Sequence, residues 1–105
     1  MTQPVLSGLV AALITPMTDD GSAVRLESVR ALVDALIRAG VDGFFACGST
    51  GETPVLSDEE RLAVSREAIH AAAGRVPVVV QATVNTTERT IHLARSLAAL
   101  GVQGI

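Results

Sequence analysis

The sequence predicts an α/β fold made of parallel strand–helix units. Three short, almost purely apolar runs, at residues 9–14, 41–47 and 76–82, alternate with three segments of helical hydrophobic spacing. Strands that are apolar on both faces are typical of parallel sheets. Such an alternation implies right-handed crossovers between neighbouring parallel strands. We therefore expect successive strand–helix units rather than hairpins.

The first unit runs from residue 9 to Gly40. Residues 9–14 form the expected strand, which Thr15, Pro16 and the turn-rich residues 19–22 bring to an end. Apolar side chains then recur at helical spacing, at Val29, Leu32, Val33, Leu36 and Ile37. Gly40 stands where the C-terminal cap of this helix belongs.

The second unit contains a loop rich in glycine and hydroxyl residues. Residues 41–47 form its strand, and residues 48–54, here called the glycine loop, read Gly-Ser-Thr-Gly-Glu-Thr-Pro. Ser57 and Glu60 have the spacing of a capping box, which predicts a helix from there to about Ala73. The acids at positions 58–60 are explained by the positive end of the helix dipole.

The third unit leads into the beginning of a fourth. Residues 76–82 form its strand, residues 83–86 its loop, and residues 87–100 a helix with Leu93, Leu97 and Leu100 on one face. The closing residues 101–105 resemble residues 40–44 at a spacing of two units, and the earlier copy leads from a helix end into a strand.

Two architectures fit three βα units and the start of strand four. One is a small open sheet of flavodoxin type, and the other is the N-terminal part of a TIM (β/α)₈ barrel. A whole barrel takes about 250 residues, so this interpretation makes residues 1–105 a single partial barrel domain without a second domain. The start of a fourth strand favours the barrel.

Composition excludes several classes of protein. The chain has 105 residues, a net charge of −3 and 49% hydrophobic residues, which argues against disorder and against a nucleic-acid partner. Its apolar runs are far shorter than the roughly 20 residues that span a bilayer. A single cysteine, Cys47, permits no internal disulfide, and a cytoplasmic location is expected. All eight basic residues are arginine, so no lysine side chain can form a Schiff base.

The glycine loop is the best candidate for a binding site. Parallel α/β folds bind ligands at the carboxyl ends of their strands, where this loop, residues 15–22 and residues 83–86 are expected. Gly48 and Gly51 allow close backbone approach, and Ser49 and Thr50 offer hydroxyl and N–H donors to a carboxylate or phosphate. The alternative is an ordinary turn in which small polar residues serve geometry alone.

Two named motifs come near the glycine loop and fail. A P-loop requires a lysine, and a nucleophile elbow requires glycine where Cys47 precedes Ser49 by two residues. Cys47 is expected to be a small buried hydrophobe, while His70 and His92 fall within helices and are expected at the surface or in helix packing.

A family resemblance follows from these motifs. The chain resembles the N-terminal part of the dihydrodipicolinate synthase / N-acetylneuraminate lyase family along its whole length, and the glycine loop is the most specific part. The supporting segments are Ala-Ala-Leu-Ile-Thr-Pro at 11–16, Asp-Gly-Ser at 20–22, Gly-Val-Asp-Gly at 40–43, Cys47 through Arg61, Gly-Arg-Val-Pro-Val at 74–78 and Gly-Val-Gln-Gly at 101–104.

The resemblance implies a class I aldolase or lyase on a TIM barrel, acting on pyruvate or a related 2-oxo acid without a cofactor or a metal. Thr50 would hold the substrate carboxylate, Ser49 would join a hydroxyl proton relay with a tyrosine, and Gly48 and Gly51 would shape the turn. Members of the family are usually homotetramers or homodimers. The Schiff-base lysine and the relay tyrosine would lie beyond Ile105, so the chain is expected to be inactive alone.

Two departures from the family pattern affect the expected substrate and regulation. Residues 81–85 read Gln-Ala-Thr-Val-Asn where the lysine-biosynthesis branch has a Gly-Thr-Gly run, which argues against dihydrodipicolinate synthesis itself. Asp58, Arg61 and Arg89 occupy the places of the histidines and glutamate of a feedback-lysine pocket, although Asn85 matches, so inhibition by lysine is not expected.

Two other classes of function stay open at this point. The chain could be a small anion-binding α/β module that uses the glycine loop. It could also be a non-functional remnant of the barrel that persists by associating with other chains, because a partial barrel leaves an open strand edge and an apolar helix face.

Overall fold

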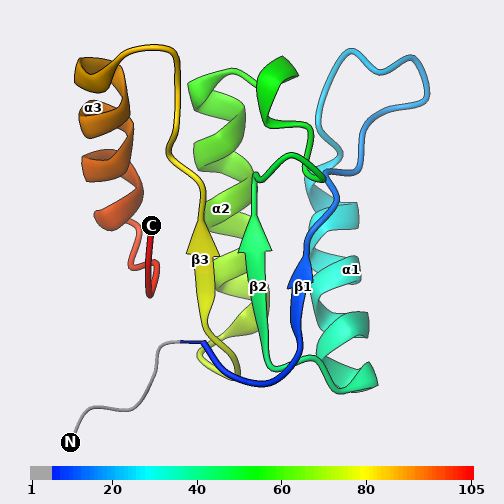
Figure 1. The fold of residues 1–105 in the computed structure, drawn as a ribbon. Helices are drawn as coiled ribbons and strands as arrows, with labels where there is room; N and C mark the ends of the chain where they lie inside the picture. The colour runs from blue at the N-terminus through cyan, green and yellow to red at the C-terminus, as the bar shows by residue number, and fades with distance from the viewer. Residues whose placement is uncertain (1–5) are drawn as a thin grey trace, which may run out of the picture.

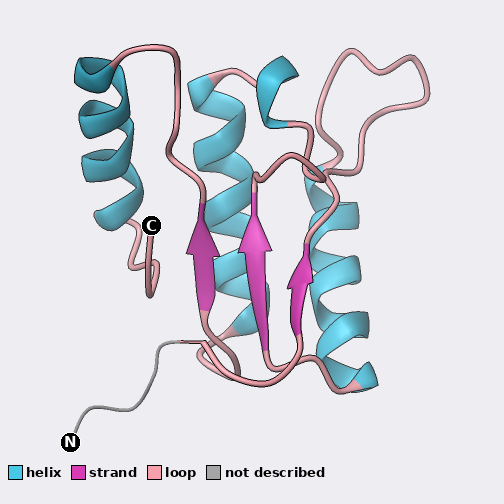
Figure 2. Cartoon of the chain, in the orientation of Figure 1, coloured by secondary structure: helices cyan, strands magenta, loops and turns pink. Residues whose placement is uncertain are grey.

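The computed structural model describes residues 6–105, which form a three-stranded parallel sheet and three α-helices (Figures 1 and 2). In chain order the elements are β1 (Val10–Ala12), α1 (Leu26–Ala39), β2 (Gly43–Ala46), the 3₁₀ helix η1 (Thr53–Val55), α2 (Asp58–Ala72), β3 (Val78–Val80) and α3 (Thr87–Ala98). Residues 1–5 of the predicted domain lie outside the described part. Within residues 6–105, no helix combines the length and the apolar character needed to cross a membrane.

The sheet has the order β1-β2-β3, and each strand pairs in parallel with the next. Phe44 lies opposite Ala11 on one side and opposite Val78 on the other. Phe44, Val78 and Val80 are almost fully buried. Figure 1 shows α1 and α2 behind the sheet and α3 beyond β3. The core therefore lies between the sheet and the helices that follow its strands.

The predicted helix signals are present in the structure. Ser57 accepts a hydrogen bond from the backbone N–H of Glu60, whose carboxylate accepts one from the N–H of Ser57, so the capping box is complete. Gly40 ends α1 in the left-handed conformation, with φ 106°, which glycine adopts without steric cost. Two ion pairs, Arg30–Glu67 at 2.9 Å and Arg75–Asp34 at 3.1 Å, tie α1 to the second unit.

The predicted fourth strand begins where expected. Gly104 forms a parallel bridge with Val79, and its carbonyl oxygen accepts a hydrogen bond of 3.1 Å from the N–H of Val80. The predicted fold class is confirmed: the chain has three βα units and the start of strand four, as in the N-terminal part of a TIM barrel. A flavodoxin-type sheet would place β1 between β2 and β3, whereas here β2 lies between β1 and β3.

The elements are shorter than the apolar runs that predict them. The first strand covers residues 10–12 instead of 9–14, the second 43–46 instead of 41–47, and the third 78–80 instead of 76–82, while the last helix ends at Ala98 and not at Leu100. Leu13 and Ala82 are buried where the chain has already left the paired strands. Apolar character therefore marks burial, which continues past the hydrogen-bonded ladder. The 3₁₀ helix η1 was not predicted.

Candidate functional site

The three loops that follow the strands lie at one end of the sheet, as the parallel topology requires. They are the loops leading into α1, into η1 and α2, and into α3 (Figure 1). Each begins at the carboxyl end of its strand, which is the end where α/β folds bind ligands. A site at this end can therefore draw on all three loops.

The loop after β1 is held by its own side chains. Asp20 accepts hydrogen bonds from the N–H of Ser22 and from the hydroxyls of Thr18 and Ser22, and these bonds lower the pKa of its carboxyl group to about 2. The carboxylate is thus occupied in shaping its loop. Thr15 is only 5% exposed and donates from Oγ1 to the carbonyl oxygen of Gly51 at 2.6 Å, which ties this loop to the glycine loop.

The glycine loop presents two free hydroxyl groups. Ser49 and Thr50 are exposed, while Gly48 and Gly51 on either side of them are buried. Within residues 6–105 the hydroxyls of Ser49 and Thr50 take part in no hydrogen bond. An incoming ligand would therefore meet two hydroxyl donors that no other group among these residues engages.

Three carbonyl oxygens in and just before the loop are engaged instead. The N–H of Glu52 donates to the carbonyl of Ser49 at 3.0 Å, and the N–H of Thr53 donates to that of Gly48 at 3.3 Å. The hydroxyl of Thr53 donates to the carbonyl of Cys47. Since these negative ends of the peptide dipoles are already bonded, the exposed rim favours an anion. The predicted loop residues are thus together, at the predicted edge.

Crowding explains both glycines. A Cβ atom on Gly48 would lie 2.4 Å from Cε1 of the Phe45 ring, and one on Gly51 would lie 3.0 Å from the carbonyl oxygen of Leu13. The sequence had suggested that glycine lets the loop approach a ligand. The structure shows that these two glycines let the loop pack closely against Phe45 and Leu13 of the same chain.

The left-handed backbone positions in and just before the glycine loop fall on other residues. Cys47 has φ 57° and Glu52 has φ 64°, a region that non-glycine residues rarely adopt and that is enriched at functional sites. Cys47 is 1% exposed, as predicted, and burial raises the pKa of its thiol. The thiol is therefore protonated and inert at neutral pH.

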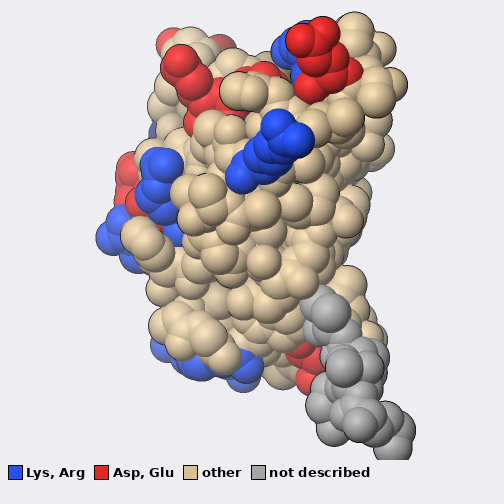
Figure 3. All heavy atoms as spheres, turned by 90° about the vertical axis from the view of Figure 1, so that its left-hand side faces the viewer, with Lys and Arg blue, Asp and Glu red and all other residues tan. Residues whose placement is uncertain are grey.

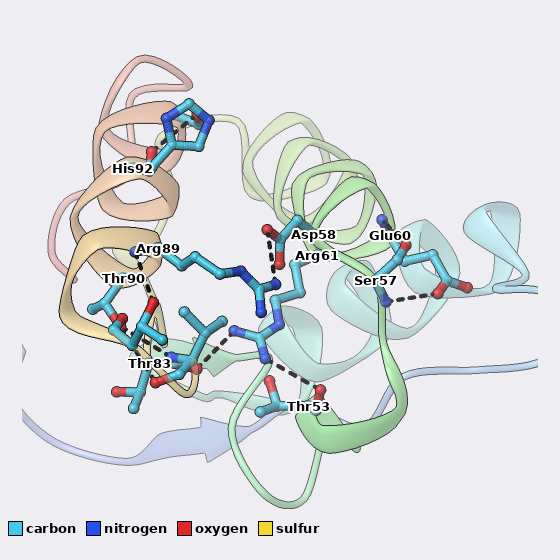
Figure 4. A network of polar contacts seen from close by, with 12 residues as sticks. Thr53, Ser57, Asp58, Glu60, Arg61, Thr83, Arg89, Thr90 and His92 are labelled. Atoms are coloured by element: carbon cyan, nitrogen blue, oxygen red, sulfur yellow. Dashed lines mark hydrogen bonds and ion pairs between the residues drawn. The ribbon is translucent and has the colours of Figure 1, made fainter.

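Arg61 joins the glycine loop to the loop after β3. From α2 its guanidinium donates from Nη2 to the carbonyl of Thr53 at 3.3 Å and from Nη1 to the carbonyl of Thr83 at 3.0 Å (Figure 4). Arg61 is only 4% exposed. The sequence placed it in the helix without predicting this burial. The helical spacing alone could have indicated this burial, because it places Arg61 on the same face of α2 as the small residues Ser65 and Ala68. Both of these are buried.

The residues at the places of the lysine pocket surround one cavity of about 770 Å³. Asp58, Arg61, Asn85 and Arg89 all line it, and Arg89 reaches from α3 to Asp58 at 3.6 Å (Figure 4). The cavity thus combines two arginines with two acids, Glu59 and Asp58, of which Asp58 is already paired. His70 and His92 are exposed, and residues 6–105 contain no group of side chains arranged to hold a metal ion.

Comparison with known proteins identifies the family. A model of the dihydrodipicolinate synthetase family matches residues 5–105. A 4-hydroxy-tetrahydrodipicolinate synthase of Sorangium cellulosum is 46% identical over 105 residues, which is 100% of this chain and 35% of the relative. The chain spans about a third of the length of the curated relatives it matches.

Solved structures agree with the sequence relatives. YagE, a prophage protein of Escherichia coli K12 in the dihydrodipicolinic acid synthase family, was solved with pyruvate; it superposes with a TM-score of 0.87 at 36% identity, over 94% of this chain and 33% of its own. An N-acetylneuraminate lyase from Mycoplasma synoviae gives 0.83 at 35% identity, over 90% and 33%.

The chain belongs to the dihydrodipicolinate synthetase family, as the family model shows. The proteins it is similar to include both synthases and a lyase. That residues 81–85 argue against dihydrodipicolinate synthesis stays a prediction.

Proposed function

We propose that this chain supplies the carboxylate-binding loop of a Schiff-base aldolase or lyase that acts on pyruvate or a related 2-oxo acid. The observation that carries the proposal is the glycine loop, where two exposed hydroxyls stand at the ligand-binding end of the sheet while neighbouring carbonyls are bonded elsewhere. The pyruvate complex of YagE supports the substrate class.

Each loop residue has a proposed role. Thr50 donates to the substrate carboxylate, and Ser49 passes a proton through its hydroxyl to a tyrosine supplied from outside this chain. Gly48 and Gly51 keep the loop close to Phe45 and Leu13, so that both hydroxyls remain at the rim. No cofactor is required, because an imine between a lysine and the keto carbon provides the electron sink.

The imine must come from another segment. The chain has no lysine, so its side chains include no amine that could attack a keto carbon. We therefore propose that residues 1–105, as one partial barrel domain, are inactive alone and act within a cytoplasmic homodimer or homotetramer of the whole barrel.

Titration of the ¹⁵N-labelled chain with pyruvate tests the carboxylate site. Saturable shifts are expected at the amides of residues 49–51, weakened at least about tenfold in Thr50→Val, because a hydrogen bond to a charged group contributes about 1.5–3 kcal/mol. Thr87→Val, which alters a threonine in α3, is the matched control. Equal affinity in Thr50→Val would contradict the role of Thr50.

Two further ligands separate the proposal from its alternatives. Acetone, which keeps the ketone and lacks the carboxylate, should not bind. Inorganic phosphate that binds more tightly than pyruvate would favour a general anion-binding module. If the folded chain binds no anion, the alternative of a non-functional remnant of the barrel is favoured. Borohydride treatment with pyruvate should leave every side chain unmodified, and an adduct on any of them would overturn the proposal.

A further inference from the structure

Arg61 is a buried cation without a counter-charge. Its side chain is 4% exposed, and none of the ion pairs formed among residues 6–105 includes it. Its acceptors are two backbone carbonyl oxygens, and its buried Nε finds no acceptor in the described part of the chain. Burying an unpaired charge costs free energy that an apolar side chain of similar length would not incur. Packing alone therefore does not account for an arginine here.

The two acceptors belong to different loops at the ligand-binding end. Thr53 lies in the glycine loop and Thr83 in the loop after β3, so one rigid guanidinium spans both (Figure 4). The planar fork of arginine fixes the separation of two acceptors, whereas a lysine would reach one point at a time. The bond across the two loops is thus specific to this side chain.

The bond to Thr53 extends to the hydroxyl residues through the backbone. The carbonyl of Thr53 accepts from Arg61, while the N–H of Thr53 donates to Gly48 and its hydroxyl donates to Cys47. Gly48 directly precedes Ser49. On the opposite side, Thr15 holds the carbonyl of Gly51, which directly follows Thr50. The Ser49–Thr50 pair is therefore held from both ends.

We infer that Arg61 is a positioning residue for the carboxylate-binding loop. It fixes Thr53, and through Thr53 it sets where the Ser49 and Thr50 hydroxyls stand relative to the loop after β3. It does not touch the substrate. The expected effect on binding rests on the proposed function. The two hydrogen bonds from Arg61 to the carbonyls of Thr53 and Thr83, here called the clamp, can be measured without a ligand.

The clamp can first be measured in the unmodified chain by NMR. The Nε–H and Nη–H protons of Arg61 should give separate, slowly exchanging signals, because the guanidinium is buried and bonded at two nitrogens. Arg66, an exposed arginine of the same helix, is the internal reference and should give averaged signals. Averaged, rapidly exchanging signals from Arg61 would overturn the inference.

Substitution then tests the effect on the loop. In Arg61→Met, the Thr53 amide should exchange at least about tenfold faster while the Phe44 amide in the sheet changes little, because the loss of a charged hydrogen bond is local. The affinity for pyruvate should fall by about the same factor. Arg66→Met is the matched control and should leave both quantities unchanged. Parallel acceleration at Thr53 and Phe44 would show a merely structural role and overturn the inference.

Chemical rescue provides a second variant. In Arg61→Ala, millimolar guanidinium should slow Thr53 exchange again and restore pyruvate affinity, whereas ammonium should not. In Arg61→Met the longer side chain fills the space, so guanidinium should have no effect. If the Thr53 amide exchanges faster in either variant while the affinity for pyruvate stays unchanged, Arg61 is not a positioning residue. Failure of the unmodified chain to bind pyruvate would instead refute the proposed function and leave the exchange results to decide on the clamp.

Discussion

At Gly48 the backbone passes so close to the Phe45 ring that a methyl group has no room. Gly48→Ala should destabilise the fold by about 1–3 kcal/mol, the usual cost of overpacking a well-filled site. Urea unfolding measures this cost, and a double-mutant cycle identifies its cause. In a Phe45→Ala background the same substitution should cost little, because the ring that it meets at 2.4 Å is gone. An unchanged cost in that background would locate the strain elsewhere.

Cys47 should make the stability of the fold fall at alkaline pH. Burial raises the pKa of its thiol above the ordinary 9.0, so ionisation favours the unfolded chain. The contribution is fully present below pH 9 and is lost as the pH rises through the folded-state pKa, at up to about 1.4 kcal/mol per pH unit.

The composition makes this experiment unusually clean. The chain has no lysine and no tyrosine, so no other side chain titrates near this pH. Urea midpoints measured from pH 8 to pH 10.5 should fall for the unmodified chain and stay level for Cys47→Ala. The same slope in both proteins would assign the effect to another group.

Single residues also show where prediction from sequence ends. The glycine loop was identified from residue types, and its exposed Ser49 and Thr50 lie where the strand–helix alternation predicted. The burial of Arg61 and Thr15 was not foreseen, because both depend on which carbonyls of distant loops come within reach. Left-handed backbone at Cys47 and Glu52 was equally hidden, since non-glycine residues rarely adopt this conformation.

Among the elements, α2 depends on its capping box. Ser57→Ala removes an acceptor for the Glu60 N–H and should cost about 1 kcal/mol. Glu60→Ala and Glu59→Ala form a matched pair, since both remove a charge from the first turn and only Glu60 bonds back to Ser57. Thermal or urea unfolding should therefore show a larger loss for Glu60→Ala. Equal losses of stability in the two variants would show that Glu60 acts on α2 only through the helix dipole and not through the capping box.

The cavity between α2 and α3 should not bind free lysine. Arg61 and Arg89 repel the two ammonium groups of the amino acid. Of the two acids that line the cavity, Asp58 is already paired with Arg89, which leaves Glu59 alone to attract a cation. L-lysine is expected to leave the amide signals of Asp58 and Asn85 unchanged in an NMR titration. Arg89→Glu, which replaces a cation of the wall by an acid, should gain measurable affinity. Saturable binding of lysine to the unmodified chain would contradict this prediction.

Element types were predictable, and strand ends were not. Hydrophobic spacing and the Ser57 capping signature located all three helices, and α2 begins at the predicted residue. Strand ends were overestimated because Leu13 and Ala82 remain buried beyond the ladder. Periodicity reports which side chains are covered, whereas strand bounds depend on which backbone groups find a partner strand.

For the whole molecule, the sheet is covered by helices on one face and is open along one edge. Within residues 6–105, β1 pairs only with β2, so its outer backbone groups have no strand partner. Phe45 points away from the helices and is 37% exposed, and Leu9 beside the open edge is 63% exposed. On the opposite side of the molecule from β1, Figure 3 shows that the face at α3 and the last residues also carries few charged side chains across its middle. Apolar surface next to an unpaired strand is a common cause of association.

The 105-residue chain should therefore associate as its concentration rises. Sedimentation velocity is expected to show species larger than a monomer, because edge pairing at β1 satisfies backbone groups and covers apolar side chains at the same time. Leu9→Arg places a charge beside that edge and should shift the distribution toward the monomer. Val55→Arg is the matched control, since Val55 is 73% exposed but lies in η1, away from the open edge. A monomer at every concentration would show that the open edge is protected in some other way, and an equal shift in both variants would reflect net charge rather than the edge.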